Sequence, residues 1–218
     1  MIGRLAAIGL VLIGFSCVSE AFAQEVAGRV VRLQGDASEV LGNTRVALAV
    51  GSPVHRNGTV ETGKDARAEL AFLDDSRLTL GAEARVGLDE LVYDMRPDSR
   101  RSEQAIRVVA GTFKFLSGAI GKQMPQAVAF TTPVATIGIR GTEFFGGPLA
   151  SGMPPGQFHY GFMILDGAIA VDTPQGGVTL DDPNEGTFLP MSGGAAPTPP
   201  ATWAQDSIDE AFASIAFR

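Results

Sequence analysis

Residues 131–147 read TTPVATIGIRGTEFFGG, and this stretch indicates the fold of the chain. Pro133 has no amide hydrogen and restricts the residue before it, so a strand can begin only after this point. The letters VATIGI form an apolar β run, in which Gly138 predicts a bulge or a close backbone approach. The letters RGT, which begin at Arg140, interrupt the run, and EFF resumes it.

Arg140 is the only basic residue of this stretch, and it has two interpretations. Its guanidinium carries five N–H donors, which must reach water or bind carbonyl and carboxylate groups. As a structural residue, Arg140 would be buried against Glu143 or a more distant aspartate. As a binding residue, it would hold an anion beside flexible glycines. We expect the structural role, because a buried charge needs partners and a fold can supply them internally.

Short β segments continue on both sides of this stretch. Residues 26–33 alternate in polarity, and residues 66–73 and 77–81 form two strands around an acidic turn. The runs FMIL and AIAV flank Asp166 and Gly167, which predicts a hairpin with a two-residue type I′ turn. Helical spacing of apolar residues is not evident before residue 200. The sequence therefore predicts an all-β fold of short strands.

The first residues differ from this pattern. MIGRLAAIGLVLIGFSCVSEAFAQ combines Arg4, an apolar run too short to span a membrane, and an A-x-A site at residues 21–23. Residues 1–23 are therefore predicted to be a cleaved signal peptide that exports the protein to the periplasm. The only cysteine, Cys17, lies in this segment. We expect a mature chain that does not span the membrane and has no thiol for a disulfide, a metal or catalysis.

The last residues form a separate unit. GGAAPTPPAT, residues 193–202, predicts an extended Pro/Ala-rich linker after a β domain over residues 24–192. Residues 203–218 predict an amphipathic helix with a capping box of Thr202 and Gln205. Its apolar face is expected to carry Ile208, Phe212 and Ile215. The helix either docks on the domain or binds a groove of a partner; we expect docking, because a free helix of this length is marginal in water.

Residues that could carry catalysis are sparse. The 218-residue chain is 45% apolar and 19% charged with a net charge of −7, so it has little attraction for nucleic acid. His55 and His159 stand in no metal-ligand spacing, and the acidic clusters fall at predicted turns. The loop at residues 146–157 is either solvated or a mobile binding loop. We therefore predict no catalytic residue, no cofactor and no metal, and we expect that the protein is not an enzyme.

The stretch TTPVATIGIRGTEF closely resembles the FecR-domain signature T-P-x-[AG]-x-[IV]-G-[IV]-R-G-T-[DE]-F. The opening GRVVRLQGDASE, the run VVAGTFKFLSGAI and the closing MILDGAIAV agree with it, so the resemblance covers about residues 26–189. It implies an exported all-β domain in a rolled or solenoid-like stack, with a β-sandwich or an open barrel as the alternative. The matching motif positions are Thr132, Pro133, Gly138, Arg140, Gly141 and Thr142.

The resemblance also implies a role in signalling. The best-known members sense an outer-membrane transporter and pass a signal to a cytoplasmic sigma factor, through an anti-sigma region and a membrane helix. Here we expect an exported stand-alone domain without that region, because the β pattern follows the signal peptide directly. We expect a non-enzymatic module that recognises an envelope protein; the alternative is a module that binds cell-wall or surface polysaccharide.

Overall fold

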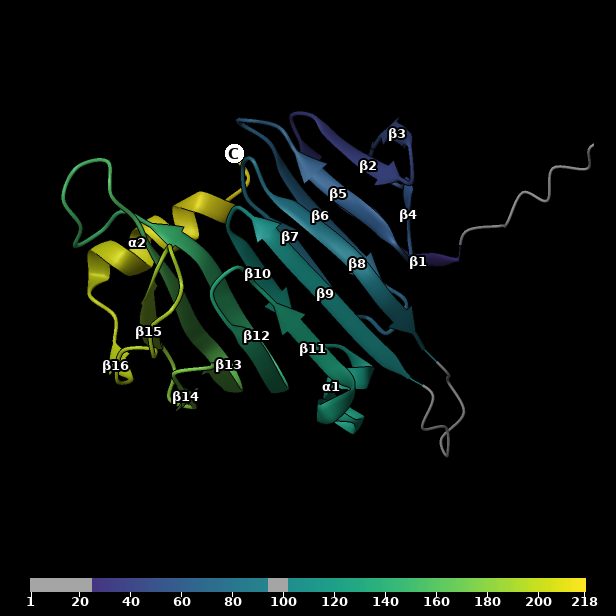
Figure 1. Cartoon of the computed structure of the whole chain (residues 1–218). Helices are drawn as coiled ribbons and strands as arrows, with labels where there is room; N and C mark the ends of the chain where they lie inside the picture. Colours follow the sequence, from purple (N-terminus) through teal and green to yellow (C-terminus); the bar gives the residue numbers. More distant parts are fainter. Residues whose placement is uncertain (1–24, 94–101) are drawn as a thin grey trace, which may run out of the picture.

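The computed structural model describes residues 25–93 and 102–218, so the predicted signal peptide lies outside the described residues. The chain forms one curled sheet, an open half-barrel, with a single long helix near its C-terminus (Figure 1). The strands are β1 Val26–Gln34, β2 Ala37–Leu41, β3 Thr44–Ala47, β4 Pro53–His55, β5 Gly58–Thr62, β6 Arg67–Phe72, β7 Arg77–Leu80, β8 Arg85–Val92, β9 Glu103–Ala110, β10 Phe113–Leu116, β11 Val128–Thr131, β12 Thr136–Leu149, β13 His159–Thr173, β14 Gly176–Leu180, β15 Glu185–Pro190 and β16 Ala201–Thr202. The helical elements are α1 Ala119–Gln123, the 3₁₀ turn η1 Pro125–Ala127 and α2 Gln205–Ile215. The predicted all-β fold with a C-terminal helix is confirmed.

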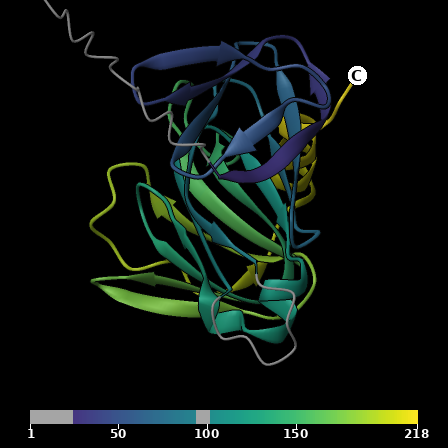
Figure 2. The same cartoon turned by 90° about the vertical axis from the view of Figure 1, so that its right-hand side faces the viewer.

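Strand β12 joins two arms of the sheet. Its first half pairs with β11 and leads through β9, β8, β5 and β2 to β3, whereas its second half pairs with β10 and leads through β7, β6 and β1 to β4. The two arms curl toward each other (Figure 2). They meet at the β4–β5 turn, where Arg56 N donates to Glu25 O at 2.9 Å and Asn57 N donates to Leu88 O at 2.7 Å. This contact between the two arms closes the sheet into a roll.

The space inside the roll is filled by aromatic side chains. Phe113, Phe115, Phe130 and Phe144 are each 0% exposed, and they come from β10, β11 and β12. Their ring centroids lie 4.6 to 6.1 Å apart, mostly in edge-to-face arrangements that suit the charge distribution of aromatic rings. Together with the aliphatic residues of the other strands they form the main core.

The predicted hairpin at Asp166 and Gly167 is wrong. Strand β13 runs straight through these residues and pairs with β12 along its whole length. The register of this pair shifts on β12 between Arg140 and Glu143, which lies opposite Asp166, so the positive φ of Gly167, +82°, serves a bulge rather than a turn. A Cβ on Gly167 would overlap the carbonyl oxygen of Gly141. The Asp-Gly pair therefore belongs to a bulge inside a long strand pair.

The segment over residues 193–202, predicted as a linker, lies against β15. Thr198 N donates to Phe188 O at 3.1 Å, and Phe188 N donates to Thr198 Oγ1 at 3.0 Å. Strand β16 then pairs with the start of β15. These bonds carry the chain back along the sheet and bring Trp203 onto it.

The C-terminal helix docks on the sheet, as predicted, and Ile215 and the partly buried Ile208 of the predicted face pack against it. Its buried residues are Ser207, Ala211 and Ile215, whereas Phe212 is 41% exposed. The N-cap is Ala204 without a side-chain hydrogen bond, so the predicted capping box is wrong. Within the described residues, no helix has both the length and the apolar character that a membrane span needs.

Candidate functional site

The first motif residues build the β11–β12 turn. The Thr132 hydroxyl donates to Ala135 O at 2.9 Å and accepts from Ala135 N at 3.1 Å. Pro133 is exposed at the tip of this turn. Thr132 and Pro133 therefore have a structural explanation within the chain, because they close the hairpin that starts β12.

The last motif residues build the bulge in β12. Gly141 has a φ of +59°, and a methyl group on it would have no other atom within 4 Å, so the backbone angle alone explains the glycine. Thr142 is buried, and its N–H donates to Ser117 Oγ at 2.8 Å. Ser117 N donates in turn to Thr142 O at 2.9 Å, which fastens the segment before α1 to the bulge.

Gly138 and Arg140 differ from these neighbours. Gly138 stands in regular register between Ala129 and Ala170, so the predicted bulge or close approach at this position is wrong. A methyl group on Gly138 would meet only Ala170 Cβ, at 3.8 Å, and the backbone has no positive φ here. Neither backbone geometry nor packing within the described chain requires a glycine at this position.

The prediction of a buried, partnered Arg140 is also wrong. The side chain is exposed, and within residues 25–93 and 102–218 it has no hydrogen bond or ion pair. Glu143, the expected partner, binds Lys114 instead, with Nζ 2.6 Å from Oε1. Arg140 extends from the outer face of β12 because Ile137 and Ile139 take the alternate, inward positions.

The register places small residues around this arginine. Ala129, Gly138 and Ala170 lie side by side across β11, β12 and β13, and Ala168 lies opposite Arg140. All five are on the outer face of the sheet, and each is exposed or half-buried. We call these residues the motif face: Ala129, Gly138, Arg140, Ala168 and Ala170. It is a flat surface with one unpaired cation among the described residues.

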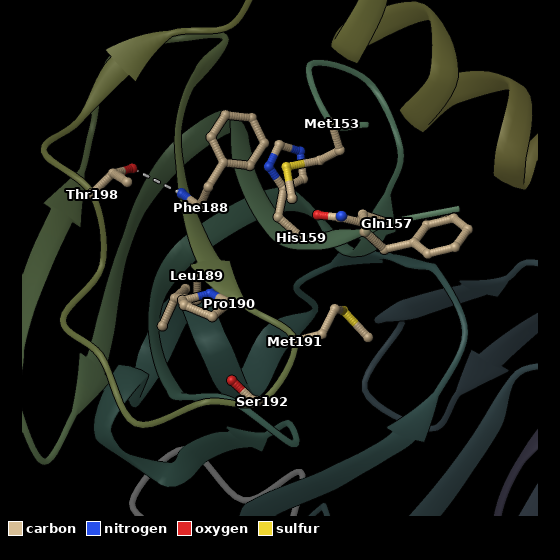
Figure 3. Close-up of a pocket in the computed structure, with 10 residues that line it drawn as sticks. Met153, Gln157, His159, Phe188, Leu189, Pro190, Met191, Ser192 and Thr198 are labelled. Atoms are coloured by element: carbon tan, nitrogen blue, oxygen red, sulfur yellow. Dashed lines mark hydrogen bonds between the residues drawn. The ribbon is translucent and has the colours of Figure 1, made fainter. Parts of the chain in front are cut away.

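A second feature lies at the other end of β13, around His159. An open apolar pocket of about 700 Å³ forms between the loop that follows β12 and the segment that follows β15 (Figure 3). Its lining residues are Met153, Gln157, Phe158, His159, Phe188, Leu189, Pro190, Met191, Ser192 and Thr198. The loop is held by Glu210 of α2, whose carboxylate accepts from Ala150 N at 2.8 Å and from Ser151 N at 2.7 Å.

The pocket begins at the end of a stack of three rings. Trp203 and Phe188 are parallel within 6° with centroids 4.8 Å apart, and Phe188 and His159 follow at 4.0 Å and 18°. The Nε2 atom of His159 is buried and has no hydrogen-bond partner within the described residues. Burial lowers the pKa of His159, and the nearby Glu210 carboxylate opposes this effect. The burial therefore favours the neutral imidazole.

Sequence reasoning missed this pocket. It gave no special role to His159 and placed the start of the loop at residue 146, although β12 continues to Leu149. A usable signal was present in the glycines Gly161 and Gly186, since a Cβ on either would overlap or crowd the indole of Trp203. Two glycines opposite a lone tryptophan can indicate an indole that lies flat on a sheet. The strand register must be known, however, before the two glycines can be placed near each other.

Two other charged clusters are paired within the chain. His55 Nδ1 lies 2.9 Å from the buried carboxylate of Glu39, and Arg107 holds Asp89 through two bonds of 2.8 Å. No three acidic, histidine or cysteine side chains converge as metal ligands in the part of the chain that the structure describes.

Comparison with known proteins agrees with the motif. Residues 58–152 match the family model described as FecR protein. Two crystal structures of a protein described as a candidate anti-sigma factor, from Parabacteroides distasonis ATCC 8503, are similar in fold. The first has a TM-score of 0.51 at 12% identity over 69% of this chain, and the second has 0.49 at 13% over the same share. This chain spans 62% of the length of that protein. No curated protein sequence matches the chain.

Proposed function

We propose that this chain, which contains a FecR-type domain, is a non-enzymatic signalling module that is exported to the periplasm and recognises an envelope protein through its motif face. One observation carries the proposal. Four of the six motif residues build a turn and a bulge, but no contact in the described chain requires a glycine at position 138 or engages the Arg140 side chain in a hydrogen bond or ion pair. Contact with another molecule accounts for both residues.

The chemistry of these two residues suits a protein partner. A glycine in a strand interior costs roughly 0.5–1 kcal/mol relative to alanine, so an exposed glycine without a local reason suggests that another backbone comes close. An unpaired guanidinium beside such a flat surface can bind a carboxylate with two parallel hydrogen bonds. We therefore propose a partner that lays an extended backbone across Gly138 and presents an aspartate or glutamate to Arg140.

The proposed location depends on the N-terminal sequence. The basic start, the short apolar run and the A-x-A site support export with cleavage after residue 23. Mass spectrometry of the protein from a periplasmic fraction should therefore find a mature N-terminus at residue 24. An intact N-terminus in the membrane fraction would contradict this part of the proposal.

The partner proposal can be tested by cross-linking in intact cells. We expect a specific cross-linked protein with the wild type that is lost with Arg140→Glu and with Gly138→Leu. Arg29→Glu is the matched control, since Arg29 is likewise exposed on a strand, in β1, without a side-chain partner in the described residues. Retention of the cross-linked protein by both motif-face variants would refute the proposal.

No observation favours the polysaccharide alternative. Trp203 is 5% exposed and Tyr160 is 1% exposed, so neither offers the open aromatic platform that sugar rings require. Sedimentation with insoluble cell-wall glycan separates the two functions. The proposed function predicts that the protein stays in the supernatant.

A further inference from the structure

We infer that the apolar pocket is a second binding site, which takes a tryptophan or tyrosine side chain of a partner protein. This site goes beyond the proposed function, because it lies at the opposite end of β13 from the motif face. All of its lining residues, from Met153 to Thr198, also follow the family match at residues 58–152. The pocket is thus an addition to the family-matched part of the chain.

The lining selects an uncharged, largely apolar group. Six of its side chains are apolar, and none of the lining residues that the structure describes is an aspartate, glutamate, lysine or arginine. Phe158 and Met191 are 51% and 44% exposed, although large apolar side chains that gather at one hollow are costly to leave in water. Methionines can adjust their thioethers to the shape of an inserted group. A charged ligand would lose its hydration here without gaining a partner.

One polar atom of the pocket narrows the choice of ligand further. A neutral imidazole has one N–H donor and one acceptor nitrogen, and His159 Nε2 is buried at the pocket without a partner among the described residues. When Nδ1 carries the proton, Nε2 can accept one hydrogen bond from a ligand that displaces the Met153 side chain beside it (Figure 3). An aliphatic or phenylalanine side chain would leave this acceptor unpaired. The indole N–H and the phenolic O–H are the donors that come with an apolar ring.

The ring stack favours an aromatic ring in the same ligand. Trp203, Phe188 and His159 form a parallel series that ends at the pocket, and Figure 3 shows Met153 beside His159 at this end. A further ring can continue the series or pack against the Met153 sulfur; both are favourable aromatic arrangements. The pocket volume of about 700 Å³ exceeds what one ring needs, so apolar neighbours of the aromatic residue can enter with it.

The inference can be tested with defined probes. We would titrate the full mature protein with N-acetyl-tryptophan amide and follow the ¹³C-labelled methionine methyl groups by NMR. The signals of Met153 and Met191 should shift saturably, whereas that of Met124, beside α1, should not. N-acetyl-lysine amide should leave all three signals unchanged. Equal shifts at Met124, or none at the two pocket methionines, would overturn the inference.

Two further measurements test the hydrogen bond and the location. The 1-methyl derivative of the tryptophan probe lacks the indole N–H and should bind about fivefold more weakly to the wild type, as the loss of one hydrogen bond implies. In His159→Leu this difference should vanish; if the wild type binds both probes equally, the role of Nε2 is refuted.

The location of the site is tested by substitution. Phe158→Ser should weaken binding severalfold, whereas Phe212→Ser on α2, where the phenylalanine is also exposed, should not. Arg140→Glu should bind the probe normally. A failure of the motif-face proposal can therefore be distinguished from a failure of the pocket inference.

Discussion

The main core and the smaller cluster under α2 are both apolar, but they are closed in different ways. The main core is enclosed by the curled sheet, and its four central phenylalanines are fully buried. The second cluster, which we call the tail cluster, lies on the outer side of β12 and β13 and is covered only by Trp203 and α2. Its members are Phe145, Leu149, Met163, Trp203, Ala211 and Ile215. The tail cluster is therefore open at one end, where the apolar pocket lies.

Adjacent residues of the same strands supply both regions. Phe144 points into the main core and Phe145 into the tail cluster, because successive side chains of a strand face opposite sides. The same alternation places Phe162 inside and Met163 outside on β13. A strand covered on both faces reads as a continuous apolar run, which explains FMIL and EFF. The curled sheet that encloses the main core builds the fold, whereas Trp203 and α2, which cover the tail cluster, leave the apolar pocket at its edge.

The largest effect is expected in the main core. Phe130→Ala removes a fully buried ring that contacts three other phenylalanines, and it should lower the free energy of unfolding by about 4 kcal/mol. Urea unfolding followed by circular dichroism measures this change, and the whole domain should lose stability together. Preserved stability would show that the roll does not depend on its aromatic centre.

Trp203→Ala should break the tail cluster with a smaller global effect. The indole packs on Phe188 and Phe145, so its loss should cost about 3 kcal/mol and free α2 from the sheet. Hydrogen exchange should show lost protection in residues 205–215 and retained protection in β6, β7 and β10. Joint loss of protection in both regions would mean that the tail cluster is part of a single cooperative unit.

Much of the fold was predictable from local pattern. The alternation over residues 66–73 and 77–81 predicted β6 and β7, and the acidic turn between them forms, with Asp75 at a φ of +65°. These elements are predictable because a hairpin of neighbouring strands uses only local information. The apolar run VATIGI likewise predicted β12, although the strand begins at Thr136 and only the alternate residues Ile137 and Ile139 of this run are buried within it.

Three of the failures share one physical cause, which is pairing over long distances. Whether Gly167 makes a turn or a bulge depends on β12, which pairs along the whole of β13. Whether Arg140 is buried depends on which face of β12 is inward, and that is decided by the register of β11 and β13. The pocket depends on residues from 153 to 203, which are assembled by the return of the chain along β15. None of these contacts leaves a signal within one short window of sequence.

A pair of glycine substitutions sharpens the contrast between the covered and the open face of the sheet. A Cβ on Gly186 would overlap the Trp203 indole, so Gly186→Ala should destabilise the tail cluster by about 2 kcal/mol through overpacking. Gly138→Ala meets only Ala170 Cβ at 3.8 Å and should be neutral or stabilise the protein by about 0.5 kcal/mol. Thermal unfolding of both variants provides the measurement. Destabilisation by Gly138→Ala would indicate a packing role for this glycine.

The smallest expected effect is a pH dependence of stability that comes from His159, beside the tail cluster. Burial lowers the pKa of His159 below its usual value of about 6.5, and Glu210 offsets part of this shift. The unfolded chain therefore binds a proton more readily than the folded chain, so stability falls as the pH drops through the unfolded pKa and levels off below the folded pKa. The loss of stability between pH 7.5 and pH 5 should be larger in the wild type than in His159→Phe, which keeps the ring stack but cannot titrate. Urea unfolding of both proteins at the two pH values isolates the effect, because all other titrating groups cancel in the difference. A wild type that gains stability at pH 5 relative to the variant would mean that stacking of the charged imidazole on Phe188 outweighs its burial.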